Sequence, residues 1–181
     1  MTAYLFASTI AGPLYGKLGD LYGRKRPLQG AVVIFLVGSV LCGLSQSMVE
    51  LIAFRALQGL GGGGLIVLAM AVIGDIIPPR DRGRYQGLFG AVFGVSTVIG
   101  PLLGGFFVDS LSWRWIFYVN LPIGATALAA IATRLQARQA TERRRIDYLG
   151  AVVLGAALSA IVLFTSLGGR RTPGARRRCW C

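Results

Sequence analysis

Long apolar stretches alternate with short polar ones along the whole chain. A helix that crosses a bilayer needs about 20 mostly apolar residues. Stretches of this kind run over residues 1–18, 28–45, 51–77, 85–108, 115–133 and 148–167. Because the polar connections between them are short, consecutive helices should run antiparallel. The pattern therefore predicts an all-α integral membrane protein of about six transmembrane helices.

Basic and non-basic connections alternate between these stretches. The connection after the second stretch holds Glu50 and no base, and the one after the fourth holds Asp109 and Arg114. Bases gather after the first, third and fifth stretches: Arg24, Lys25 and Arg26, then Arg80, Arg82 and Arg84, then Arg134, Arg138, Arg143, Arg144 and Arg145. By the positive-inside rule the basic connections face the cytoplasm. We expect a multi-pass protein of the plasma membrane, with the lipid bilayer as its surroundings.

The composition excludes several classes of protein. Hydrophobic residues make up 54% and charged residues 14%, whereas soluble domains carry about 25% charged residues. The net charge is +12, but the bases sit in short runs between apolar stretches, so we expect no nucleic-acid partner. The sequence has no histidine and no intramembrane carboxylate pair for acid–base work, so we expect no metal, no cofactor and no enzyme.

The last residues break the alternation of charge. Five arginines follow the sixth stretch, on the side that the alternation places outside: Arg170, Arg171, Arg176, Arg177 and Arg178. Either the sixth stretch does not insert as drawn, or the tail is not native sequence, and we favour the second explanation. We divide the chain into a membrane domain, 1–169, and a basic tail, 170–181, that is disordered or frameshifted.

The first candidate site lies in the first basic connection. Its glycines suit a tight turn, and Asp20 and Arg24 are four residues apart, so they can pair if the segment is helical. Taken alone, this is a solvated loop. It resembles the loop signature G-x-L-x-D-x-x-G-R-(K/R)-(K/R) of the major facilitator superfamily, met by Gly16, Leu18, Asp20, Gly23, Arg24, Lys25 and Arg26. The resemblance implies a gating latch in which Arg24 pairs with an acid, and Asp75 is well placed for this.

The second candidate site is an arginine inside an apolar stretch. Placing the charge of Arg55 in an apolar stretch costs free energy. Its side chain therefore either faces a cavity or partner, or snorkels to the interface near Glu50. Gln58, three residues on, shares its helix face. The stretch resembles the fourth-helix motif L-x-x-x-R-x-x-Q-G-x-G of the same superfamily. The resemblance implies that Arg55 and Gln58 take part in proton coupling.

The third candidate site is a strip of small residues in the fourth stretch. Small residues three or four apart make a flat face that lets a neighbouring backbone approach closely. The strip resembles the signature G-x8-G-x3-G-P-x2-G-G of drug antiporters, with a serine in place of the middle glycine. The matching positions are Gly87, Ser96, Gly100, Pro101, Gly104 and Gly105. The resemblance favours an antiporter over a symporter or sugar-type porter.

The resemblance also implies how much of a transporter is present. The segments 113–124 and 146–150 look like the starts of helices six and seven in the fourteen-helix drug:proton antiporters. The chain would then cover helices two to seven of an incomplete major-facilitator bundle, and its partner would be the missing transporter half. The implied function is proton-coupled efflux of small drug-like compounds, driven by the proton gradient. We expect the fragment alone to be inactive, and the alternative is a non-transporting membrane remnant that associates with other helices.

Overall fold

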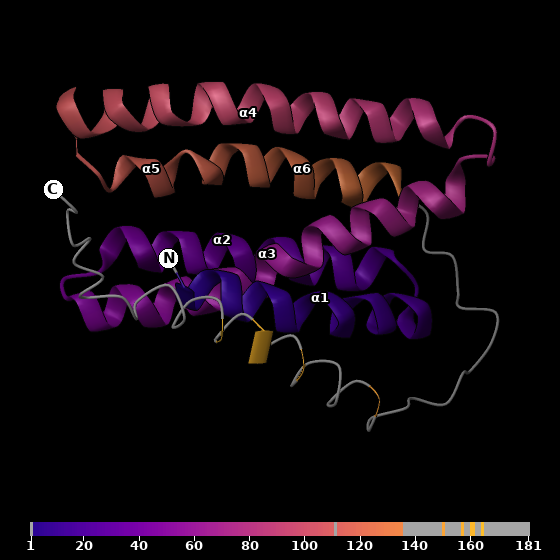
Figure 1. Cartoon of the computed structure of the whole chain (residues 1–181), viewed down its shortest axis with the longest axis horizontal. Helices are drawn as coiled ribbons and strands as arrows, with labels where there is room; N and C mark the ends of the chain where they lie inside the picture. The colour runs from indigo at the N-terminus through magenta and orange to yellow at the C-terminus, as the bar shows by residue number, and fades with distance from the viewer. Residues whose placement is uncertain are drawn as a thin grey trace, which may run out of the picture.

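The computed structural model describes residues 2–110 and 112–135, together with the isolated positions 150, 157, 160, 161 and 164. Every element in these residues is a helix: α1 Thr2–Tyr22, α2 Lys25–Leu44, α3 Met48–Ile76, α4 Arg82–Ser110, α5 Trp115–Tyr118 and α6 Asn120–Arg134. The long axes lie nearly parallel, with α4 at the outside of the array (Figure 1). The all-α membrane fold is thus confirmed. The predicted sixth span, 148–167, and the tail, 170–181, lie outside the described residues apart from those isolated positions.

Among the described residues, four segments are long and apolar enough to cross a membrane: α2, α3, α4 and the combined run Trp115–Arg134. The helix α1 has comparable length but is not among them. The sequence predicted that this helix ends at residue 18 and that a connection follows, and this boundary is wrong. The helix continues to Tyr22, and the turn is confined to Gly23 and Arg24.

The predicted span 115–133 is interrupted near its start. The helix α5 ends at Tyr118 and α6 begins at Asn120, with Val119 between them. Pro122 explains the break, because it has no N–H to donate and its ring clashes with the carbonyl four residues earlier, here that of Tyr118. Hydropathy alone did not reveal this break.

The ends of α3 are defined by side chains and by proline. Ser47 caps the first turn by accepting the Glu50 N–H at 3.2 Å, and the Glu50 carboxylate accepts the Gln46 N–H at 2.9 Å. The other end stops at Ile77, directly before Pro78, because a residue that precedes proline is disfavoured in the helical region.

The helix α3 packs between α1 and α2, and its glycines make this possible. A Cβ added at Gly61 would lie 2.5 Å from the Phe35 nitrogen of α2. One added at Gly63 would collide with the Ser8 carbonyl of α1. The small core beside this contact contains Leu28 and Leu68. The three helices therefore approach at backbone distance, which only small residues permit.

The helix α4 has very different surroundings. Within the described part of the chain it contacts only its neighbours in sequence, α3 and α5. None of its residues is buried. The antiparallel course of the chain nevertheless places its first turn beside the end of α3 (Figure 1).

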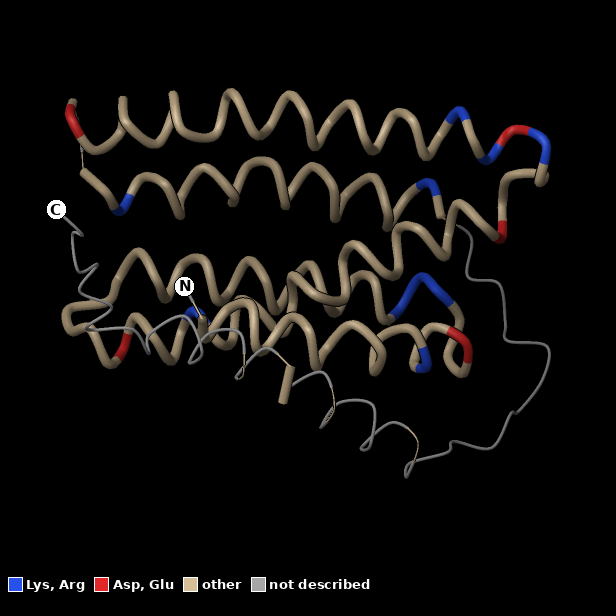
Figure 2. Tube along the Cα trace, viewed as in Figure 1, with Lys and Arg blue, Asp and Glu red and all other residues tan. Residues whose placement is uncertain are grey.

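The charges gather at the two ends of the bundle (Figure 2). One end holds the turn between α1 and α2, the connection from α3 to α4, and the last turn of α6. We call it the basic end, and its bases include Arg24, Arg82 and Arg134. The opposite end carries Glu50 and Asp109. This segregation agrees with the alternation predicted from the sequence, and Arg55 of α3 is the exception among the described charges, since it lies away from both ends.

Candidate functional site

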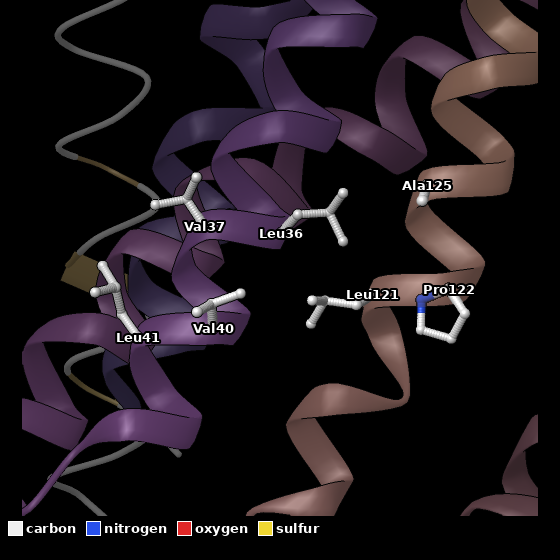
Figure 3. A pocket seen from close by; sticks show the side chains of 7 residues that line it. All are labelled: Leu36, Val37, Val40, Leu41, Leu121, Pro122 and Ala125. Atoms are coloured by element: carbon white, nitrogen blue, oxygen red, sulfur yellow. The ribbon is translucent and has the colours of Figure 1, made fainter.

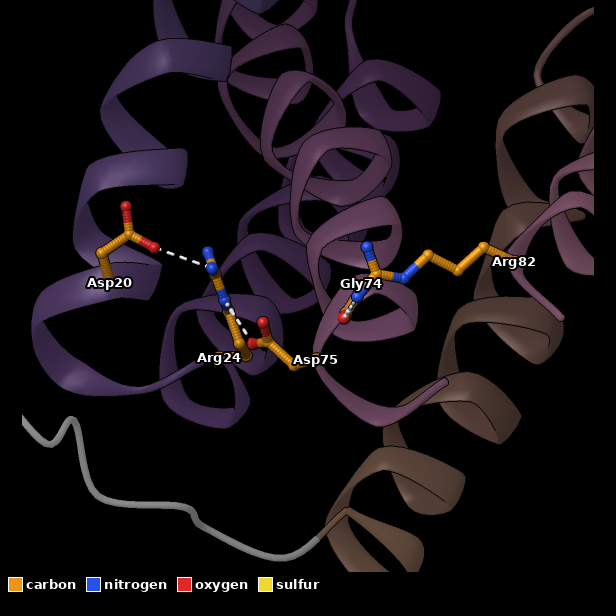
Figure 4. A network of polar contacts seen from close by, with 5 residues as sticks. All are labelled: Asp20, Arg24, Gly74, Asp75 and Arg82. Carbon is orange, nitrogen blue, oxygen red and sulfur yellow. Dashed lines mark hydrogen bonds and ion pairs between the residues drawn. The ribbon is translucent and has the colours of Figure 1, made fainter. Parts of the chain in front are cut away.

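Arg24 joins two helices at the basic end. Its Nη2 lies 2.7 Å from Asp20 Oδ1, and its Nε donates to Asp75 Oδ2 at 2.9 Å (Figure 4). The side chains are 24% exposed for Arg24, 61% for Asp20 and 49% for Asp75, so water partly screens both pairs. The structure therefore forms the two contacts that the sequence predicted, and they connect the turn after α1 to the last turn of α3.

The turn that presents Arg24 depends on glycine. Gly23 has φ = 80°, which residues with a side chain rarely adopt. Gly19 lets α1 approach α3, since a Cβ there would lie 2.7 Å from Leu68 Cδ2. Gly16 faces the same helix with more room, because its Cβ would meet Val67 at an ordinary 3.5 Å. The motif glycines thus bring the end of α1 up to α3.

Two further bases hold helix ends at this site. Arg82 donates from Nη2 to the Gly74 carbonyl at 2.6 Å (Figure 4). Its Nε also donates to the Ile77 carbonyl at 3.2 Å. Lys25 donates to the Ala132 carbonyl of α6 at 2.8 Å. Cations at a helix C-terminus satisfy unpaired carbonyls and oppose the helix dipole.

In the sequence, Arg82 indicated only the orientation of the chain, and its contact with the end of α3 was not predicted. The signal for this contact is a base, Arg82, that follows a few residues after the proline at the end of α3. Arg82 acts on the turn of α3 that carries Asp75, so it belongs to the same site as Arg24.

Arg55 lies inside the bundle at a second site. Its Nη1 donates to Gln58 Oε1 at 3.4 Å, which their predicted position on one helix face permits. Its guanidinium carbon lies 4.7 Å from the centre of the Phe117 ring and 6.0 Å from that of Tyr4. Arginine is attracted to the face of an aromatic ring, so the two rings partly replace the water that the charge has lost. Of the two alternatives, the structure supports an inward-facing Arg55.

Gln58 connects Arg55 to a buried polar cluster formed by Ser39, Cys42, Gln58 and Asn120. Gln58 Nε2 donates to Ser39 Oγ at 3.1 Å, and Asn120 Nδ2 donates to the same oxygen at 3.0 Å. The Cys42 thiol lies 4.0 Å from Gln58 Oε1. In the described residues no buried side-chain nitrogen or oxygen lacks a partner. Sequence analysis missed Ser39 and Asn120, although polar residues within apolar spans are a functional signal.

The charge of Arg55 is not neutralised by the part of the chain described. No carboxylate there forms an ion pair with it, and Glu50 instead accepts the Gln46 N–H. An arginine in an apolar span that has no opposite charge beside it still attracts an anion. The described residues also bring together no group of three metal-ligating side chains.

An apolar groove of about 510 Å³ lies between α2 and α6 (Figure 3). Seven residues line it: Leu36, Val37, Val40 and Leu41 of α2 and Leu121, Pro122 and Ala125 of α6. The groove offers no charged or polar side chain that would orient a polar ligand. The groove is therefore an apolar surface, unlike the polar and charged site around Arg55.

The small-residue strip of α4 faces open space in the described structure. A Cβ added at Gly87, Gly100, Gly104 or Gly105 would meet nothing within 4 Å. Pro101 lies inside the helix, which continues past it. No described backbone approaches this face, so close packing against it stays a prediction.

The fold and the charge pattern define a multi-pass helical membrane protein. The sequence profile of the Major Facilitator Superfamily matches residues 1–172, and the chain belongs to this superfamily. An uncharacterized MFS-type transporter of Mycobacterium tuberculosis is 52% identical over 169 residues, which are 93% of this chain and 25% of that protein. Multidrug resistance protein 3 of Bacillus subtilis is 46% identical over 171 residues, 94% of this chain and 33% of that protein. A fungal efflux pump of a Fusarium species is 40% identical over 177 residues, 94% of this chain and 31% of that protein.

The chain thus spans about a quarter to a third of the length of these relatives. The matched region contains the basic-end site, the Arg55 site and the strip of α4.

Proposed function

We propose that the chain forms part of a proton-coupled antiporter that exports small drug-like compounds across the plasma membrane. The observation that carries the proposal is the position of Arg55, a cation held inside a membrane bundle by an amide oxygen and two aromatic rings. An ionisable residue in such a place marks a substrate, ion or proton pathway by default. The names of relatives, a multidrug resistance protein and efflux pumps, support export as the direction.

The charge of Arg55 suggests how the transporter releases a proton. A nearby cation favours the ionised form of a carboxylate, so a carboxylate that approaches Arg55 releases its proton. Arg55 and Gln58 would form the coupling pair, and the carboxylate would come from another part of the transporter. The proton gradient is then the energy source, and no cofactor or enzymatic step is needed.

The Arg24 site suggests the conformational part of the cycle. Transporters of this architecture alternate between two states by moving one bundle against the other around a midplane site. The ion pairs of Arg24 with Asp20 and Asp75 are exposed, so their formation and rupture cost little. They act as the gate at the basic end, and the second transporter half is the partner that moves against it.

A chimera tests this function. Residues 1–169 replace the matching segment of Multidrug resistance protein 3 of B. subtilis, and ethidium export and proton flux are measured together in inverted membrane vesicles. We expect the chimera to export dye at the expense of the gradient, and Arg55→Leu to abolish both fluxes. Arg114→Leu, which removes a base at the opposite end of the bundle, is the matched control. A folded chimera that exports dye without proton flux contradicts the coupling role.

A second candidate function is association with other helices without transport. The open face of α4 favours it, because a membrane helix with small residues and no neighbour is suited to packing. The chimera separates the two candidates, because a segment that only associates with other helices would leave the chimera folded but unable to export dye. From the chain alone, reconstituted in vesicles, we expect no substrate-stimulated proton flux, and any such flux would contradict both this alternative and our expectation that the fragment is inactive.

A further inference from the structure

The hydroxyl of Ser39 is the centre of the buried polar cluster. It accepts hydrogen bonds from Gln58 Nε2 at 3.1 Å and Asn120 Nδ2 at 3.0 Å, and it donates to the Phe117 carbonyl at 2.9 Å. Ser39 is fully buried, and Gln58 is 2% exposed. A serine hydroxyl has one hydrogen and two lone pairs. These three contacts therefore use its entire hydrogen-bonding capacity.

This arrangement determines which way the Gln58 amide faces. A glutamine side chain carries an oxygen that accepts and a nitrogen that donates. Because the Ser39 hydrogen is directed to the Phe117 carbonyl, Ser39 can only accept from Gln58. The amide nitrogen of Gln58 must then face α2, and its oxygen must face Arg55.

The opposite orientation of the Gln58 amide would leave both its nitrogen and its oxygen without a hydrogen-bond partner. Its nitrogen would face the guanidinium of Arg55, which has donors and no acceptor. Its oxygen would face Ser39, whose single hydrogen is already used. Buried polar groups are almost always paired, so only the observed orientation satisfies the whole cluster.

We propose that Ser39 is a positioning residue for Arg55, acting through the orientation of the Gln58 amide. The inference rests on the proposed role of Arg55 in proton coupling. The amide oxygen holds the guanidinium beside Phe117 without neutralising it, at 3.4 Å from Nη1. Arg55 is thereby kept at one place with its charge available to an anion.

The experiment uses the full chain in lipid nanodiscs and needs no transport. The first readout is solvent exchange of the Gln58 side-chain amide, followed by NMR with labelled glutamine and assigned with Gln58→Leu. The second readout is the infrared S–H stretch of Cys42, with Cys179 and Cys181 replaced by serine so that one thiol remains. The Cys42 thiol lies 4.0 Å from Gln58 Oε1, so its band reports where that oxygen points.

Two variants remove one hydroxyl each from a membrane helix. Ser39→Ala deletes the orienting group. Thr97→Ala is the matched control, because within the described residues the Thr97 hydroxyl bonds only to the Phe93 carbonyl of its own helix, on the exposed α4. We expect amide exchange in Ser39→Ala to be about tenfold faster and the S–H band to move to that of a free thiol. Both signals should stay unchanged in Thr97→Ala.

Unchanged signals in a folded Ser39→Ala chain overturn the proposal. If that variant does not fold, Asn120→Ala carries the test, because it leaves the Ser39 hydrogen on the Phe117 carbonyl and should preserve both signals. Free-thiol and fast-exchange signals in Asn120→Ala would assign the orientation to Asn120 and overturn the role of Ser39. A transporter that proves not to be proton-coupled changes none of these spectra, so the two failures are distinguishable.

Discussion

The helices α3 and α4 have the same length, 29 residues each, and opposite surroundings. Both are apolar enough to span a membrane and both are rich in glycine. Yet α3 buries Gln58 and several glycines against α1 and α2, whereas α4 buries no residue. Hydropathy and glycine content therefore predict a membrane helix but not whether its small residues are in contact with anything. Only the presence of a neighbouring backbone separates the two cases.

The largest expected effect comes from replacing a glycine of α3 by alanine, with the same replacement in α4 as the comparison. We expect Gly61→Ala to lower stability by about 3 kcal/mol, because the new Cβ overlaps backbone atoms of α2 that cannot move aside independently. Thermal unfolding of the chain in detergent measures the loss.

Gly94→Ala is the matched change in α4, where a Cβ meets nothing within 4 Å. It should leave stability unchanged or raise it by up to about 1 kcal/mol, since alanine favours helix more than glycine does. Equal losses in the two variants would show that α4 is packed as closely as α3.

A smaller effect is expected where the two helices meet in sequence. Arg82, in the first turn of α4, donates to two carbonyls at the end of α3. Arg82→Met should lower stability by about 1–2 kcal/mol, because it leaves helix-terminal carbonyls without a charged donor. Arg84→Met changes a base of the same turn and is the control, and thermal unfolding compares them. A larger loss in Arg84→Met would refute the capping role.

Sequence reasoning located what depends on composition and local spacing. The long helices, their antiparallel order and the basic end follow from apolar length and from where arginines fall, and the structure confirms them as far as residue 135. The contact of Arg24 with Asp75 was also predicted, but through a family resemblance, since nothing local brings residues 51 positions apart together.

What the sequence did not predict depends on three-dimensional contact. The helical course of residues 19–22 escaped prediction because a polar segment at a membrane surface looks like a loop, although water satisfies its polar groups on a helix equally well. Ser39 and Asn120 lie 81 positions apart and meet only after α2 and α6 pack. Each alone resembles an ordinary small polar residue in an apolar span, so neither stood out.

The smallest expected effect concerns the exposed ion pairs that tie α1 to α3. Asp75→Asn keeps an acceptor for Arg24 but removes the charge, at a site where Asp75 is 49% exposed. We expect a loss of only about 0.5 kcal/mol, since water and side-chain entropy offset most of the attraction of an exposed pair. Thermal unfolding at low and high sodium chloride should show the loss shrinking with salt, because the Debye length falls from about 10 Å at 0.1 M to about 3 Å at 1 M. Asp109→Asn, at the opposite end of the bundle, should show no comparable loss. A large, salt-independent loss in Asp75→Asn would instead mean that the pair is a fixed part of the fold, which is incompatible with a gate that opens in each cycle.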